Sequence, residues 1–328
     1  MKDKIAECPS SGITRNRFRF LFVILLSGVA LGSGATITFT SRGFSPPGPL
    51  IQDEHFRDYE VRIYKRDDAT FLERVCHRLP GRLSGFVQRV MGRQEWSGVE
   101  ILKNGRRVFS TYGGAYIGIA EFGSNSVVGM DITGEGKSNI ALSESLGRQG
   151  GGAFYLFECS EKFRQIATVE SRGTYPELKD LDGDGIPELI ASDDAFYHWP
   201  VCRDGEPIPE VILRWRNGKY VAARDLMCKP ASTKEELEVM ATAVRSSSKW
   251  NAEFGWVPSE LWTNAIALMY SGHENLGWKF VDRAWQPGFP GEDGSLSKEQ
   301  LIDHYLRSRL DESRYWPDLK EQSSTPLR

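Results

Sequence analysis

The sequence predicts a mainly β fold with an α-helical C-terminal part. Three hairpin turns, at Asn104-Gly105, Ser160-Glu161 and Asn217-Gly218, follow one another at intervals of 56 and 57 residues. Two polar loops, which begin at Asp131 and Asp180, lie 49 residues apart. A regular spacing of this kind indicates repeated β units that must stack on each other to bury their apolar faces. The remaining signals, toward the C-terminus, are those of helices.

Composition and charge narrow the class of protein. A chain of 328 residues with 40% hydrophobic and 26% charged residues can form one large or two small domains with a core. The formal net charge is -3. Residues 1–19 contain five basic and two acidic side chains, a balance of +3, so the remainder carries -3 - 3 = -6. An acidic body argues against nucleic acid as the main partner, because phosphate binding requires a basic face.

Residues 1–41 predict a cytoplasmic tail followed by a membrane anchor or a signal peptide. Phe20 to Thr40 contains no charge, and basic residues precede it. The stretch is long enough for a membrane-spanning helix. Alternatively, its first half is the core of a secretory signal, with Ser33-Gly34-Ala35 as the cleavage site. Either way the body lies outside the cytoplasm, and residues 42–58, rich in Pro and Gly, predict an extended stalk.

Four cysteines lie in this extracytoplasmic part, and they leave the pairing open. They are Cys76, Cys159, Cys202 and Cys228. Two disulfides are possible in an oxidising compartment, with Cys202–Cys228 preferred because the two residues flank one predicted hairpin. The alternative is four buried thiols.

Three further segments complete the predicted organisation. Residues 59–97 form a mixed lead-in, with a strand at Tyr59–Lys65 and two short helices after it. Residues 98–230 form the β-repeat domain with its three hairpins. Residues 231–328 form a helical region, in which Ser232–Glu235 and Ser297–Gln300 have the pattern of capping boxes.

Two further helices are predicted at 259–270 and 274–285. Their apolar residues recur at helical spacing, which predicts core packing; a ligand groove between the helices is the alternative. These residues are Leu261, Trp262, Ile266, Leu268, Met269, Trp278, Phe280, Val281 and Trp285.

The nine residues from Asp180 to Glu188 predict a calcium site. Calcium takes six to eight oxygen ligands, and four carboxylates this close together would repel one another without a cation. The predicted ligands are Asp180, Asp182, Asp184, Glu188 and the backbone carbonyl of Ile186. Gly183 and Gly185 allow the chain to curl, because glycine adopts positive φ without strain. The competing interpretations are an EF-hand, which would need Glu at the position of Ala191 and flanking helices, and a solvated acidic turn.

This loop resembles the FG-GAP or VCBS repeat, the calcium-loop blade of integrin-α-type β-propellers. Asp180, Asp182, Asp184 and Glu188 fall on the metal positions of that family. The earlier loop resembles a degenerate copy, in which Asp131, Thr133, Glu135 and Asn139 take the corresponding places. Because this earlier loop has only two formal charges, the resemblance implies weak or no calcium binding there. A closed propeller needs at least four blades, and two loops with three hairpins fall short. The resemblance therefore implies an incomplete, propeller-like sheet capped by the C-terminal helices, unless 59–96 hides a further strand set.

No catalytic motif is recognisable in the sequence. Asp193 and Asp194, close to His198, are interpreted as a surface turn rather than an acid/base cluster. The sequence thus predicts a non-enzymatic, extracytoplasmic, calcium-binding structural or interaction protein, held near the membrane by its N-terminus, whose partner is another protein or an envelope component. The alternative is an extracytoplasmic hydrolase or carbohydrate-active enzyme in which calcium is a scaffold. An accessory subunit of an envelope complex, using the aromatic helices as its interface, is a third possibility.

Overall fold

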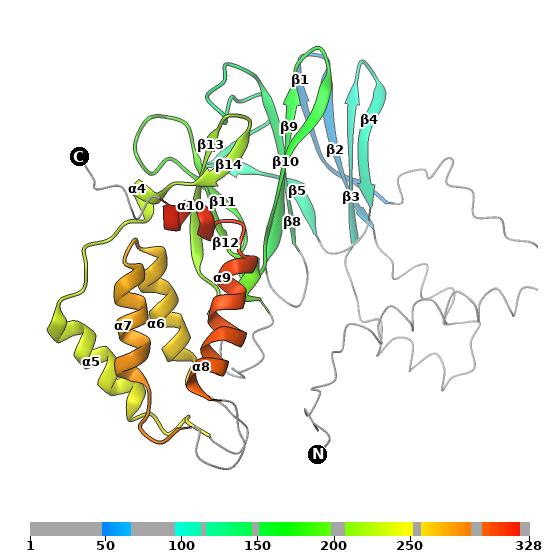
Figure 1. Cartoon of the computed structure of the whole chain (residues 1–328). Helices are drawn as coiled ribbons and strands as arrows, with labels where there is room; N and C mark the ends of the chain where they lie inside the picture. Colours follow the sequence, from blue (N-terminus) through cyan, green and yellow to red (C-terminus); the bar gives the residue numbers. More distant parts are fainter. Residues whose placement is uncertain are drawn as a thin grey trace, which may run out of the picture. The chain divides into compact units, whose positions relative to one another are not determined.

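The structure is a computed structural model, and Figure 1 shows its ribbon. It describes residues 48–66, 96–112, 116–145, 151–197, 207–251, 257–289 and 297–321. The predicted membrane segment, residues 69–95 of the predicted short helices, Cys76, Cys202 and His198 lie outside these ranges. Within them, every helix is too short or too polar to cross a membrane. Among these residues Cys159 and Cys228 are not joined in a disulfide, and the Cys202–Cys228 pairing stays a prediction because Cys202 lies outside them.

The first sheet is an antiparallel meander of four strands. These are β1 (Leu50–Phe56), β2 (Tyr59–Arg66), β3 (Trp96–Lys103) and β4 (Arg106–Tyr112), paired in that order. The hairpin at Asn104-Gly105 is confirmed, with both residues at positive φ, as a two-residue hairpin turn requires. The strand at Tyr59–Lys65 is also confirmed.

The predicted stalk at 42–58 is wrong in its second half, because Leu50–Phe56 forms β1. This strand pairs with β2 from Leu50 to Phe56, and the Lys65 amide donates to the carbonyl of Pro49 over 3.0 Å. Proline lacks an amide hydrogen, but β1 is an edge strand and Pro49 precedes it, so no ladder bond is lost. The Pro and Gly content of the segment obscured a strand that directly follows it.

The second and third sheets contain the two predicted repeats. The second sheet has the order β10-β9-β8-β5 and the third β14-β13-β12-β11-β6-β7. The bounds in the second sheet are β5 Ile117–Ile119, β8 Asn139–Ser145, β9 Gly152–Cys159 and β10 Phe163–Ser171. Those in the third are β6 Glu121–Phe122, β7 Asn125–Ser126, β11 Glu177–Lys179, β12 Glu188–Ser192, β13 Glu210–Arg216 and β14 Lys219–Ala222. The succession of loop, apolar strand and hairpin occurs twice, as predicted, in β8-β9-β10 and in β12-β13-β14.

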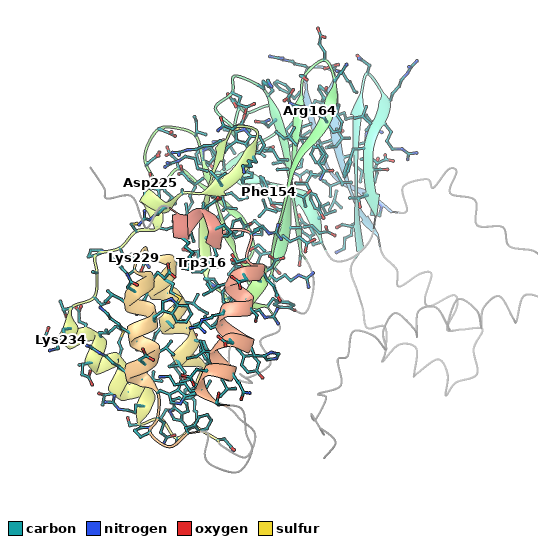
Figure 2. All side chains as sticks on the ribbon, in the orientation of Figure 1. Phe154, Arg164, Asp225, Lys229, Lys234 and Trp316 are labelled. Atoms are coloured by element: carbon teal, nitrogen blue, oxygen red, sulfur yellow. The ribbon has the colours of Figure 1, made fainter. Side chains whose placement is uncertain are left out.

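The second sheet is buried between the other two. One of its faces, with Ile140 and Phe157, shares a hydrophobic cluster with Val61 and Ile101 of the first sheet. The opposite face belongs to a larger cluster that includes the third sheet; Phe154, labelled in Figure 2, makes an edge contact with Tyr220 of β14. Burial on both faces explains why β9 is apolar almost throughout and why the first four residues of β8 are buried.

The C-terminal region is helical and shares the larger core cluster with the third sheet. Its helices are α4 (Arg224–Met227), α5 (Lys234–Arg245), α6 (Ser259–Tyr270), α7 (Glu274–Ala284), α8 (Lys298–Leu301), α9 (Ser308–Glu312) and α10 (Trp316–Glu321), with a π-helical turn, η3 (Ile302–Arg307), between α8 and α9. Figure 1 shows α5, α6 and α7 side by side. The apolar residues predicted as core are buried, with Trp278 partly so, which confirms the packing interpretation.

The two capping boxes have different outcomes. The box at Ser297 is confirmed, since its hydroxyl accepts from the Gln300 amide and the Gln300 side chain accepts in return. The box predicted at Ser232–Glu235 lies one residue later, between Thr233 and Glu236. Both Ser232–Glu235 and Thr233–Glu236 fit the capping-box pattern. The second forms because α5 begins directly after Thr233.

The fold class is as predicted: mainly β, with helices toward the C-terminus and, in the described part of the chain, no sheet that closes into a barrel. Residues 50–66 and 96–112 supply a further strand set, so that three sheets of four or more strands stack in series. The helical region covers part of the third sheet, because α10, which begins at Trp316 (Figure 2), lies against β14. The described sheets therefore form an incomplete β-repeat body that does not close into a ring.

Candidate metal centre

The two polar loops have the same hydrogen-bond scheme. The Asp180 carboxylate accepts from the amides of Gly183 and Gly185, at 2.7 and 3.0 Å. The Asp131 carboxylate accepts from Gly134 and Gly136, at 2.9 and 2.6 Å. All four glycines have positive φ, which allows each loop to curl around its first carboxylate. The loops are therefore structural copies of each other.

The last residue of each loop is buried and closes the turn. Glu188 is 1% exposed, and its carboxylate accepts from the Leu181 amide over 2.9 Å. Asn139 is fully buried, and its side-chain oxygen accepts from the Ile132 amide over 3.0 Å. Each residue also begins the strand that follows its loop, β12 or β8. A strand after Glu188 excludes the EF-hand interpretation, which requires a helix there.

The second loop gathers carboxylates as a metal site would. One carboxylate oxygen from each of Asp180, Asp182 and Glu188 lies within 4.8 Å of the other two. Asp184 is outside this group; it is exposed, and it accepts from the Ile186 amide over 2.8 Å. The side chain of Ile186 lies against Gly134, where a Cβ would approach its Cδ1 to 2.4 Å. The two loops therefore touch, and three of the four predicted carboxylates converge.

The carboxylate cluster contains a cation that the loop motif did not predict. Arg214 of β13 donates from Nη2 to Asp182 over 2.6 Å and from Nε to Glu188 over 3.0 Å. Its Nη1 donates to Asp225 of α4 over 3.1 Å. Burial opposes the charge of the guanidinium, but its bonds to Glu188 and Asp225 outweigh this and raise the Arg214 pKa above its usual value. The carboxylates are therefore neutralised in part by the protein itself.

The first repeat has a carboxylate where the second has Arg214. Asn139, the last residue of the first loop, pairs with Glu158 across β8 and β9. In the second repeat Leu189 pairs with Leu213, so Glu188, the last residue of the second loop, lies opposite Arg214. Glu158 is bound by Arg164, labelled in Figure 2, at 2.7 Å and by Lys137 at 3.1 Å. The hydrogen bond from Arg164 lowers the pKa of Glu158 to about 2. Both repeats thus have an ion-paired residue at this strand position, with the signs of charge reversed.

The first loop does not gather its oxygen ligands. The Thr133 hydroxyl donates to Asp131 over 3.0 Å, but the Glu135 carboxylate accepts from the indole of Trp215 over 2.8 Å. Lys137 lies 3.6 Å from Glu135 as well. Within the described residues, the groups of side chains suited to a metal do not include this loop. The expectation of weak or no calcium binding in this loop stays a prediction.

The interpretation of Asp193 and Asp194 as a surface turn is wrong for Asp193. Its side chain is fully buried after β12 and accepts from Tyr270 over 2.6 Å, from Ser313, and from the Ala195 amide over 3.0 Å. Burial raises the pKa of Asp193, against the hydrogen bonds from Ser313 and Tyr270. Asp194 is paired with Arg314 at 3.1 Å. These contacts connect the third sheet to α6 and to the segment between α9 and α10, which is a structural role.

Comparisons with protein-family models, with curated proteins and with solved structures find no match to this chain. The resemblance to FG-GAP or VCBS repeats therefore rests on the loop residues alone.

Proposed function

We propose that this chain is a calcium-binding structural or interaction protein of the FG-GAP or VCBS type. One observation carries the proposal: two loops share one hydrogen-bond scheme, and the more acidic one gathers Asp180, Asp182 and Glu188 within 4.8 Å. Oxygen-only ligands of this charge suit a hard divalent cation, and calcium in particular. In the proposed site Asp184 and the carbonyl of Ile186 supply further ligands.

Arg214 is the competitor of calcium in this proposal. A divalent ion bound by Asp182 and Glu188 must displace the guanidinium from both carboxylates, since two cations cannot share those oxygens at close range. Asp225 remains as a partner for the displaced side chain. Competition of this kind weakens calcium binding, which places the affinity in the range of extracellular modules, about 10⁻⁴ to 10⁻³ M.

The position of the loop suggests what calcium does. The loop connects β11 to β12, and its Ile186 packs on Gly134 of the first loop. A bound ion would hold both ends of this connection and, through Ile186, the contact between the two repeats. Calcium is thus proposed to stiffen the contact between the two repeats. Binding of a partner is proposed to use other surfaces of the sheets or helices.

The same proposal places the body outside the cytoplasm. The uncharged stretch from Phe20 to Thr40, after a basic lead, supports an N-terminal anchor or signal. The partner is proposed to be another protein or an envelope component, in keeping with the acidic body.

Removal of calcium is expected to lower the melting temperature of the full-length chain. With calcium at ten times its Kd, binding adds about 1.4 kcal/mol to the free energy of unfolding. That corresponds to a rise of roughly 2–3 °C, which a chelator should abolish. Asp182→Ala should remove most of the response, whereas Glu135→Gln in the first loop should keep it. A melt that is identical with calcium and with chelator would refute the proposed site.

A further inference from the structure

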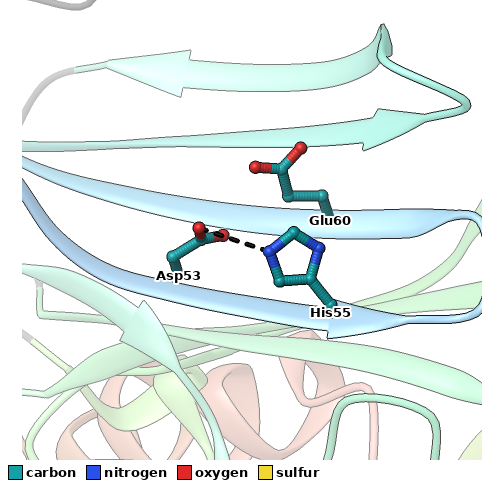
Figure 3. A group of neighbouring side chains, drawn as sticks. All are labelled: Asp53, His55 and Glu60. Carbon is teal, nitrogen blue, oxygen red and sulfur yellow. Dashed lines mark ion pairs between the residues drawn. The ribbon is translucent and has the colours of Figure 1, made fainter.

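We propose that Asp53, His55 and Glu60 form a second metal site, selective for zinc or a similar borderline divalent ion, on the outer face of the first sheet. Figure 3 shows Asp53 and His55 on β1 and Glu60 on the neighbouring strand β2. One ligand atom from each side chain lies within 4.8 Å of the other two. The site is separate from the calcium loop and does not depend on it.

The register of the first hairpin brings these three residues together. His55 pairs directly with Glu60 across β1 and β2, so the two side chains lie on the same face. Asp53 is two residues before His55 on β1 and therefore shares that face as well. The inner face of the hairpin carries Tyr59, Val61 and Ile63 of the core. Because all three candidate ligands stand on paired strands and not on a loop, their spacing is set by the sheet.

The ligand types and one distance favour zinc. Imidazole nitrogen with carboxylate oxygen is a donor set for zinc, with bonds of about 2.0–2.2 Å in a tetrahedron. Two ligand atoms of such a tetrahedron lie about 3.3–3.5 Å apart. The Nε2 atom of His55 forms an ion pair with Oδ2 of Asp53 over 3.3 Å (Figure 3), a separation that also matches that edge. The imidazole also discriminates against calcium and magnesium, which prefer oxygen ligands.

Charge and orientation on this face also suit a divalent ion. Arg62 pairs with Glu60 through Nε and Oε1, which fixes the carboxylate and leaves Oε2 free of that bond. With Asp53 and Glu60 ionised and Arg62 charged, the group is net negative when the imidazole is neutral. The net negative charge would therefore attract a divalent metal ion, and the ion pair with Arg62 would hold the Glu60 carboxylate in place.

The site is open to solvent on one side. The side chain of His55 is 66% exposed and that of Asp53 34% exposed. Three protein ligands around a tetrahedral ion leave a fourth position for water or for a side chain from another molecule. The structure thus supports an open site, unlike a closed structural zinc site with four protein ligands.

The test is zinc binding by the full-length, tag-free chain, with calcium present in excess to saturate the proposed calcium loop. Wild type is expected to bind one zinc ion per chain in equilibrium dialysis, and Co²⁺ in its place should show the visible bands of four-coordinate cobalt. His55→Ala and Asp53→Asn are expected to weaken the affinity by about 100-fold or more. His304→Ala, which removes an exposed histidine outside both metal-type groups, should bind as wild type does.

Each variant is also melted without metal, to confirm that its fold is intact; an exposed position should change the melting temperature little. Zinc binding that is unchanged in His55→Ala and Asp53→Asn would overturn the proposal, as would a wild-type chain that binds no zinc. Asp182→Ala separates the two sites, because it should abolish the calcium response and leave zinc binding intact.

Discussion

Replacement of Arg214 by methionine is expected to destabilise the chain in calcium-free solution and to increase its response to calcium. Without the guanidinium, Asp182 and Glu188 face each other unneutralised. Breaking a fully buried ion pair costs about 3–5 kcal/mol, and partial exposure of Asp182 reduces the expected loss to about 2–3 kcal/mol. Calcium then binds without a competitor, so the stability regained on its addition should exceed that of wild type. Urea denaturation with and without calcium measures both effects.

Arg216→Met is the matched control, since Arg216 lies two residues further along β13 and is exposed. It should change the free energy of unfolding by less than about 0.5 kcal/mol in either solution. If Arg214→Met were as stable as wild type without calcium, the role of Arg214 as the internal cation would be wrong. If it lost stability and calcium did not restore it, the carboxylates would not form a calcium site.

Replacement of Asp193 by alanine is expected to cost about 3–5 kcal/mol of folding free energy. The change removes a fully buried carboxylate and leaves the hydroxyls of Tyr270 and Ser313 without their acceptor. Because these residues belong to the helical region, α6 should lose protection from amide hydrogen exchange earlier than β8 and β9 do. Urea denaturation and hydrogen exchange together measure the loss and its location.

Asp194→Ala tests whether the effect is specific to the buried acid. Asp194 is the next residue along the chain, and its ion pair with Arg314 is partly exposed. Removal of such a pair should cost less than about 1 kcal/mol. Equal losses in the two variants would show that Asp193 does not join the sheet to the helices.

Local signals in the sequence were sufficient for much of the fold. Asn104-Gly105 and Asn217-Gly218 formed their predicted hairpins because positive φ at both positions is a property of the residues themselves. The curl of the loop at Asp180 likewise depends on residues within five positions of one another, and its internal hydrogen bonds follow the predicted curl. The capping box at Ser297 belongs to the same class of short-range features.

Features that depend on pairing between distant segments were not predictable in the same way. Arg214 reaches Glu188 only through the register of β12 and β13, two strands that are separated in the sequence by residues 193–209. One signal was present: Val211, Leu213 and Trp215 alternate with Ile212 and Arg214, which places a charged side chain on one face of a largely apolar strand. The burial of Asp193 depends on Ser313, 120 residues away, and local sequence contains no trace of that contact.

Calcium equilibrium dialysis of the full-length chain tests the proposed loop most directly. One calcium ion is expected per wild-type chain, none for Asp182→Ala and one for Glu135→Gln, because the second loop is the one in which three carboxylates converge. Retention of a full equivalent by Asp182→Ala, or absence of calcium from wild type at concentrations well above about 10⁻³ M, would contradict it.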